Sequence, residues 1–318
     1  MEKNINKYSK VAVFGGSGLL GSAIVRELKR RGYTNITVMR SKDLNLLHQC
    51  DVQTYFQNNS YDAVFMTAGL VGGIVGNQKR NADFLYQNAT MILNLLEAIK
   101  NTTPQTKVLY TGSTCIYPKE NPQPISEDRF LAGKFEETNK GYAMAKSLGV
   151  VACELYSKQY GMNCISVMPT NLYGPNDNYD LENGHMIPSL IKKFSIAKRD
   201  GTDVTLWGSG KPRREALYTD DCADAIVHLM ENYNGRDIVN IGTGFDYSIK
   251  EFAEIIADEV GYTGTVYWDT SKPEGVFEKR TDITRLKKLY PEYKPRSLRE
   301  GVRALLSNEK ELRRILGE

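Results

Sequence analysis

The sequence predicts an α/β protein built on a doubly wound parallel sheet, with a smaller mixed α/β domain beside it. Three observations support this fold class. Short β-branched runs alternate with helical segments from residue 11 to about residue 170, and strands separated by helices pair in parallel. The glycine-rich turn GGSGLLG follows the first of these runs at once. Beyond residue 170 the alternation stops, which indicates a second unit.

The first unit is expected to hold five short apolar strands and at least three helices. The helices fall at 22–32, where apolar residues recur at helical spacing up to Gly32, at 91–101, and at about 139–160. The strands are VAVF (11–14), ITVM (36–39), AVFMTAG (63–69), KVLYTGS (107–113) and CISVMP (164–169).

The stretch NLYGPNDNYDLENGHM (171–186) is rich in Asn, Asp, Gly and Pro and predicts a functional loop. Further helices are expected at 186–198, 220–233, 248–260 and 298–306, with strands near 203–207, 237–241 and 264–268. We expect the helix at 220–233 and the strand at 237–241 to return to the large sheet. The first domain therefore takes residues 1–175 plus about 217–243, and the second takes about 176–216 and 244–318.

Composition limits the function classes. The 318 residues are 41% hydrophobic, which predicts a globular chain, and 41 basic against 38 acidic residues with mixed signs argue against a nucleic-acid partner. The polar start and the lack of a run of about 18 apolar residues predict neither a secretory signal nor a membrane span, and hence a cytoplasmic protein. Five cysteines without C-x-x-C spacing and three scattered histidines argue against disulfides and predict no metal site.

The glycine turn predicts a dinucleotide site. It satisfies G-x-G-x-x-G directly after a predicted strand and at the start of a predicted helix, where backbone N–H groups can approach a pyrophosphate. The alternative is a glycine-rich turn without a ligand. The expected cofactor contacts here are Gly15, Gly16, Ser17, Gly18, Leu19, Leu20 and Gly21.

Arg40 follows the second strand, about 20 residues after the turn, where an NAD site would often carry Asp or Glu for the ribose 2′-hydroxyl. Arginine cannot accept a hydrogen bond but pairs well with a 2′-phosphate, so the residue favours NADP(H). A solvated Arg40 is the alternative, and Lys42 or Asp43 could modify the preference.

Tyr142 and Lys146 stand four residues apart, on one face of the helix predicted at 139–160. An ammonium beside a phenol lowers the pKa of the phenol, which makes the tyrosine a proton donor to a developing alkoxide. Ser113 at the end of a predicted strand could join that tyrosine at the cofactor cleft.

GGSGLLG, Ser113 and the Tyr142/Lys146 pair together resemble the extended short-chain dehydrogenase/reductases. The segments GLVGGI (69–74), GSTCIYPK (112–119), VMPTNLYGPNDN (167–178), GHMIP (184–188) and WGSGKPRRE (207–215) resemble the GDP-L-fucose synthase family within them, over about residues 10–300. The chain departs from that family at Ala216, where an aromatic residue is usual, and at Gly69, where alanine is usual.

The resemblance implies a Rossmann fold, NADP(H) and a GDP-keto-sugar substrate. Beyond the glycine turn and Arg40, the cofactor-binding positions that match the family are Ala68, Gly69, Thr111, Gly112, Ser113, Tyr142, Lys146, Pro169, Thr170, Asn171, Leu172 and His185. The positions that match its substrate contacts are Lys193, Trp207, Arg214, Glu274 and Lys279.

The implied reaction inverts C3 and C5 of a 4-keto sugar and then reduces C4. Cys115 and His185 match the family's acid/base pair, and Cys115 is expected to point to the same side as Ser113 along an extended stretch. The implied activity is conversion of GDP-4-keto-6-deoxy-D-mannose to GDP-L-fucose.

Two alternatives stay open. The same chemistry could act on another GDP-4-keto sugar, such as that on the route to GDP-colitose, where only C5 is inverted. A non-catalytic NADP(H)-binding regulator would keep the glycine turn but lose Tyr142 or Lys146, and both are present. The helices near 91–101 and 139–160 could form the four-helix homodimer interface usual in the superfamily.

Overall fold

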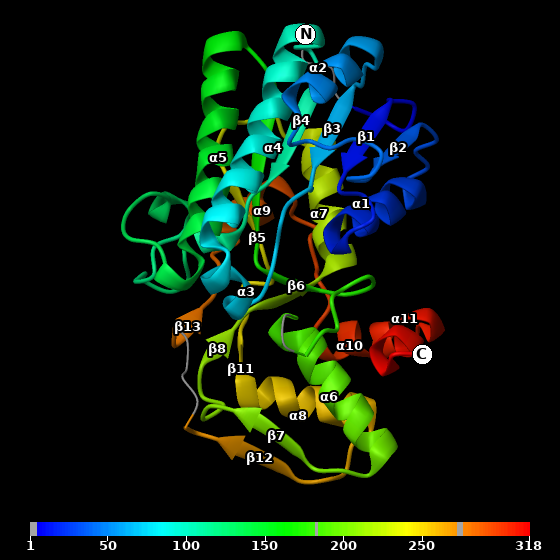
Figure 1. Ribbon diagram of the computed structural model, residues 1–318, viewed down its shortest axis with the longest axis vertical. Coiled ribbons are helices and arrows are strands. Elements are labelled where there is room, and N and C mark those ends of the chain that lie inside the picture. The colour runs from blue at the N-terminus through cyan, green and yellow to red at the C-terminus, as the bar shows by residue number, and fades with distance from the viewer. Residues whose placement is uncertain (1–4, 182–183, 272–275) are drawn as a thin grey trace.

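The computed structural model describes residues 5–181, 184–271 and 276–318. Figure 1 shows a large upper unit that carries the N-terminus and a smaller lower unit that carries the C-terminus. The large unit is built on a six-stranded parallel sheet in the order β10-β5-β4-β3-β1-β2. Its strands are β1 (Val11–Phe14), β2 (Ile36–Met39), β3 (Ala63–Met66), β4 (Lys107–Thr111), β5 (Cys164–Pro169) and β10 (Val239–Ile241).

Both faces of this sheet are covered by helices, as its nearly continuous apolar strands require. Alternate strand residues divide between two cores: Ala12 and Phe14 of β1 belong to one, and Val11 and Val13 to the other. The first core packs against α2 (Gln49–Asn58), α4 (Asn81–Thr102) and α5 (Lys140–Tyr160), and the second against α1 (Leu19–Arg30), α7 (Thr219–Asn232) and α9 (Thr284–Leu289). The predicted doubly wound α/β class is confirmed.

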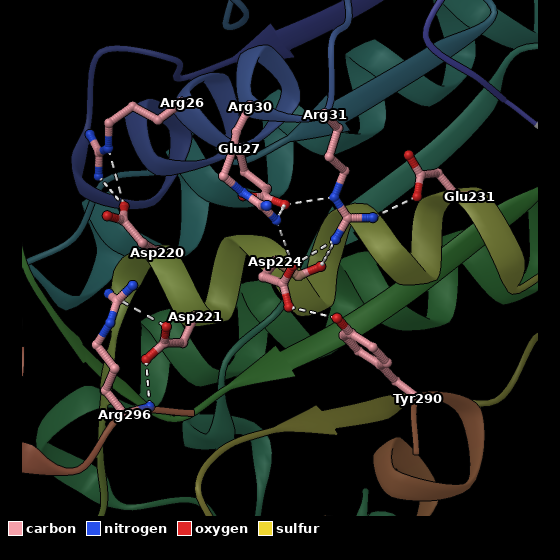
Figure 2. A network of polar contacts seen from close by, with 10 residues as sticks. All are labelled: Arg26, Glu27, Arg30, Arg31, Asp220, Asp221, Asp224, Glu231, Tyr290 and Arg296. Carbon is pink, nitrogen blue, oxygen red and sulfur yellow. Dashed lines mark hydrogen bonds and ion pairs between the residues drawn. The ribbon is translucent and has the colours of Figure 1, made fainter. Parts of the chain in front are cut away.

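Ion pairs join α7 to the helix that follows the glycine turn (Figure 2). Arg31, the residue directly after α1, pairs at 2.6 to 2.7 Å with Glu27 of α1 and with Asp224 and Glu231 of α7. Glu27 is almost fully buried. With β10 on the edge of the large sheet, α7 thus belongs to the large unit in space. The exact domain boundaries stay a prediction.

In its described residues, the lower unit consists of short sheets and helices around a third core. A two-stranded parallel pair, β6 (Asn171–Tyr173) with β9 (Ala216–Tyr218), lies where the two units meet. Its other elements are α6 (Met186–Asp200), β7 (Val204–Trp207), β8 (Arg213–Arg214), β11 (Tyr247–Ser248), α8 (Ile249–Val260), β12 (Val266–Asp269), β13 (Glu278–Lys279), α10 (Leu298–Leu306) and α11 (Glu309–Leu316).

Several elements differ from the expectation. The segment 107–113 is a strand only to Thr111, and a 3-10 turn follows at Thr114–Ile116. The helix expected at 91–101 begins at Asn81, preceded by the short α3 (Ile74–Lys79). The helix α2 was not expected, because its ten residues bury only Val52 and Phe56 and so carry little periodic signal.

Candidate active site

The glycine turn has the shape that a diphosphate requires. Gly15 has a φ of +81°, and a Cβ there would lie 2.7 Å from the backbone nitrogen of Ala68. A Cβ on Gly21 would lie 2.1 Å from the carbonyl oxygen of Gly15, so only glycine lets α1 pack onto the turn. The α1 helix begins after Gly18, which provides no side-chain cap, so its first N–H groups can receive an anion. These residues fit a dinucleotide.

Arg40 lies just past β2 and is exposed, but it is not a freely solvated side chain. Asp43 accepts from its guanidinium through both carboxylate oxygens, at 2.7 and 3.0 Å. This hydrogen bonding raises the pKa of Arg40 and lowers the pKa of Asp43. A 2′-phosphate at Arg40 would therefore meet a guanidinium already paired with a carboxylate.

The α5 helix brings Tyr142 and Lys146 to the end of β4. The hydroxyl of Tyr142 lies near enough to Ser113 for that side chain to lower its pKa, and its ring packs edge-on against Phe84 with 6.3 Å between centroids. The Lys146 ammonium donates to the carbonyl of Thr111 at 2.8 Å and lies 5.8 Å from the Tyr142 ring centroid. The structure thus brings Ser113, Tyr142 and Lys146 together.

Burial acts on these two groups in opposite directions. It raises the pKa of Tyr142, with a further rise from the charge of Cys115 and an opposing effect of the Ser113 side chain. It lowers the pKa of Lys146 from 10.5 to about 8. The expected lowering of the Tyr142 pKa by Lys146 is not found: burial raises that pKa, and Lys146 is not among the groups that shift it.

Cys115 lies near Tyr142 and Lys146, but the backbone between Ser113 and Cys115 differs from the extended stretch that was expected. The Ser113 hydroxyl accepts from the Cys115 backbone N–H at 3.2 Å and starts a 3-10 turn, so the stretch between them is not extended. Cys115 is nevertheless partly exposed and close enough to both Tyr142 and Lys146 to affect their pKa values. The turn, not strand alternation, directs the thiol to the site.

The loop after β3 lies against Lys146. A Cβ on Gly69 would lie 3.6 Å from the Lys146 ammonium and 3.0 Å from the side-chain oxygen of Asn88. Asn88 is buried, accepts from Leu70 N–H at 2.9 Å and donates to the Leu70 carbonyl at 3.0 Å. Sequence reasoning missed Asn88, because a single Asn inside an apolar helix gives no motif.

Residues 169–172, where the sequence predicts cofactor contacts, follow β5 at the carboxyl edge of the large sheet. Pro169 ends the strand, Thr170 donates its N–H to the Ile241 carbonyl at 2.9 Å, and Leu172 packs against the second core. Asn171 in β6 donates through its side chain to the Glu215 carbonyl at 2.9 Å. The segment therefore links the large sheet to the lower unit.

His185 stands at the start of α6, and its carbonyl accepts from the N–H of Ser189 at 3.1 Å. Its surface is open to solvent, yet enough protein surrounds the imidazole for burial to lower its pKa. Across 5–181, 184–271 and 276–318, no hydrogen bond or ion pair joins His185 to Cys115 or Tyr142. Lys193, two turns along α6, is half-buried, and burial lowers its pKa as well.

Arg214 and Lys279 are register partners on the parallel strands β8 and β13, so their side chains share one face. Among the described residues, the Arg214 guanidinium donates to two carbonyls, those of Arg213 at 2.7 Å and Phe277 at 3.4 Å, and burial lowers its pKa. No carboxylate within the described ranges pairs with it. Such a partly buried cation is suited to an anionic ligand.

The remaining expected positions are less informative. Trp207 ends β7 and is 66% exposed. Glu274 lies outside the described residues. Among the residues that the structure describes, no cluster of three or more His, Cys, Asp or Glu could hold a metal ion, and no helix has the length and apolarity to cross a membrane.

Comparisons with known proteins identify the family of the chain. Residues 11–242 match the model of the NAD dependent epimerase/dehydratase family. The GDP-L-fucose synthase of Escherichia coli K12 is 43% identical over 88% of this chain and 90% of its own, and the GDP-L-colitose synthase of Yersinia pseudotuberculosis is 38% identical over 87% and 90%. A GDP-L-fucose synthetase from Naegleria fowleri, solved with NADP bound, superposes with a TM-score of 0.86 at 29% identity, covering 98% of this chain and 97% of that one. The resemblance found in the sequence is confirmed, and the chain belongs to the NAD-dependent epimerase/dehydratase family.

Proposed function

We propose that this chain is an NADPH-dependent enzyme that inverts C3 and C5 of GDP-4-keto-6-deoxy-D-mannose and then reduces C4, giving GDP-L-fucose. The observation that carries the proposal is the gathering of Ser113, Cys115, Tyr142 and Lys146 at one end of β4. Similarity to GDP-L-fucose synthases over most of the chain supports the substrate. A non-catalytic NADP(H)-binding regulator would not require these four side chains close together.

In the reduction, NADPH supplies the hydride. Tyr142 donates its proton to O4 of the sugar, and its raised pKa keeps the hydroxyl protonated at neutral pH. Ser113 lies beside the phenol and favours loss of its proton, and Lys146 provides positive charge where oxygen becomes negative.

In the epimerisation, the C4 ketone acidifies the protons on C3 and C5. Cys115 and His185 are the proposed acid/base pair, one removing a proton and the other returning it to the opposite face. Support for Cys115 is its position beside Tyr142 and Lys146. Support for His185 is its place at the start of α6 and a pKa lowered by burial, which leaves the imidazole neutral and able to accept a proton near pH 7.

The nucleotide end is proposed to lie on the lower unit. Arg214 and Lys279 supply two cations from one face of adjacent strands for the diphosphate, and Lys193 adds a third from α6. Trp207 offers an exposed aromatic surface for the sugar or base. Arg40 is proposed to meet the 2′-phosphate of NADPH.

The test is incubation of the purified chain with GDP-4-keto-6-deoxy-D-mannose and NADPH, with the product's configuration at C3, C4 and C5 read by NMR. GDP-L-fucose with one NADPH consumed per product is the expected result. An intact ketone, or a product with C3 and C5 unchanged, contradicts the proposal.

A second candidate keeps the site and changes the sugar. The similarity to a GDP-L-colitose synthase favours a 3,6-dideoxy substrate, for which only C5 is inverted. Competition between the 6-deoxy and the 3,6-dideoxy ketone in one reaction separates the two, because the preferred substrate is converted first.

We also propose a cytoplasmic homodimer. Exposed apolar side chains lie on the two adjacent helices: Leu85, Tyr86 and Leu93 on α4, and Met144, Leu148 and Leu155 on α5. Two copies of this pair would bury them in a four-helix interface. Light scattering that gives twice the chain mass supports the dimer, and Leu148→Glu should shift it toward the monomer. All five cysteines are free thiols, which suits a reducing compartment.

A further inference from the structure

Glu215 directly follows the diphosphate candidate Arg214 and is completely buried. Its carboxylate accepts five hydrogen bonds. One oxygen accepts from Thr243 N–H at 2.6 Å, Gly244 N–H at 2.8 Å and the Thr243 hydroxyl at 3.2 Å. The other accepts from Thr281 N–H at 2.8 Å and its hydroxyl at 2.6 Å. Because backbone N–H groups can only donate, this is the pattern of an ionised carboxylate.

These hydrogen bonds join three chain segments that are distant in sequence. They tie the end of β8 to the loop that follows β10 and to the residues that follow β13. The fit is tight, since a Cβ on Gly242 would lie 2.3 Å from the Glu215 carboxylate. The Glu215 backbone adds two contacts: its N–H donates to the Lys279 carbonyl at 3.3 Å, and its carbonyl accepts from Asn171.

Burying a carboxylate without a cation beside it costs desolvation free energy, and hydrogen-bond donors must compensate that cost. No Lys, Arg or His in the described part of the chain forms an ion pair with Glu215. Successive residues of an extended chain point to opposite sides, so the carboxylate faces away from the Arg214 guanidinium. Glu215 therefore joins β8 to β13 without forming an ion pair with Arg214, so the positive charge of Arg214 stays available for an anion.

We propose that Glu215 is a positioning residue for the diphosphate of the nucleotide-sugar. It holds β8 and the end of β13 together, which keeps Arg214 and Lys279 side by side on one face of these strands. It also accepts from two N–H groups of the loop after β10. The backbone around the two cations is therefore held in place before a ligand binds. This inference rests on the proposed function, because it names what supports the site of that GDP-sugar.

The test compares ligand binding rather than turnover alone. Glu215→Gln keeps the side-chain size but places an NH2 group against N–H donors, so β8 and β13 should lose their fixed register. We expect GDP to bind about tenfold or more weakly by calorimetry, while NADPH binding changes less than about twofold. In turnover, KM for the GDP-sugar should rise by more than kcat falls.

Glu127→Gln is the matched control. Glu127 is another buried carboxylate, and it accepts from the Asn240 N–H at 3.0 Å in the large unit. Its loss should cost stability without changing GDP affinity. Thr281→Val is a milder variant that removes only one hydroxyl donor from Glu215 and should weaken GDP binding by a smaller factor, should Glu215→Gln fail to fold.

Three results overturn the inference. GDP affinity equal to wild type in both Glu215→Gln and Thr281→Val removes the positioning role. Equal losses of GDP and NADPH binding show a general structural role instead. Failure of the wild-type chain to bind GDP overturns the proposed function itself, and the inference with it.

Discussion

Replacing the buried Lys146 by methionine should make the ligand-free protein more stable while it abolishes reduction. Lys146 is only 4% exposed and makes one hydrogen bond, to the Thr111 carbonyl. Its pKa is lowered from 10.5 to about 8 by burial. The folded state therefore holds the ammonium less readily than the unfolded chain does, and folding is opposed wherever the group is charged.

The size of this effect follows from the pKa values. A shift from 10.5 to about 8 corresponds to about 3 kcal/mol at pH 7, at about 1.36 kcal/mol per unit. Methionine leaves the Thr111 carbonyl unpaired, which costs about 1 kcal/mol. The net expectation is a gain of about 2 kcal/mol in the free energy of unfolding at pH 7.

The pH dependence gives the assay its specificity. Between the folded and the unfolded pKa values the unfolded chain binds more protons, so wild-type stability rises with pH, and the penalty is complete only below about pH 8. The advantage of Lys146→Met over wild type should therefore shrink by about 2 kcal/mol between pH 7 and pH 9.5, measured by urea unfolding without ligands.

Lys107→Met serves as the control, because that buried lysine donates to the carbonyls of Met230 and Tyr233 and to the side chain of Asn234, all at 2.7 to 2.8 Å. This variant should be less stable than wild type at both pH values. The reasoning fails if Lys146→Met is destabilised at pH 7, or if its advantage does not change with pH.

Three further outcomes are expected. Arg40→Ala should erode the preference for NADPH over NADH, whereas Asp43→Asn should strengthen it because the Arg40 guanidinium loses its ion-pair partner. The ratio of kcat/KM for NADPH to that for NADH measures this preference, and equal use of both cofactors by the wild type would refute it. Tyr142→Phe should lower reduction by about 10² to 10⁴ with NADPH binding retained, and near-normal NADPH oxidation would remove Tyr142 from the mechanism. Cys115→Ser and His185→Asn should each suppress solvent deuterium incorporation into the keto-sugar; if both exchange at the wild-type rate, the acid/base pair lies elsewhere.

Much of the fold could be predicted because its signals are local. The βα alternation and the glycine turn lie in contiguous segments, and the parallel sheet that they predict is present. The sequence also indicated that 237–241 returns to the sheet, where β10 pairs with β5. The α11 helix gave too little signal, because its eight residues, EKELRRIL, are mostly charged and bury only Glu311 and Ile315.

The position of a site residue could be predicted where a sequence motif fixes its spacing. It could not be predicted where a turn or a partner distant in sequence determines where the side chain lies. Tyr142 and Lys146 meet because four residues span one helical turn. The path from Ser113 to Cys115 depends instead on one hydroxyl that bends the chain. Glu215 has all five of its donors at least 28 residues away, so no local pattern shows that its carboxylate is buried and fully hydrogen-bonded.

The electrostatics around Cys115 favour one order of events. A negative charge on the Cys115 thiol raises the pKa of Tyr142 and also that of Lys146. In the proposed mechanism Cys115 carries a negative charge after it gives up its proton, and Tyr142 is then a weaker acid and keeps its own proton. Once the thiolate has taken a new proton from solvent at the end of an inversion, that charge is gone and Tyr142 can donate more readily to the C4 oxygen. Proximity between the thiol and the phenol thus suppresses reduction during proton exchange at C3 and C5, which is the order that the proposed reaction requires.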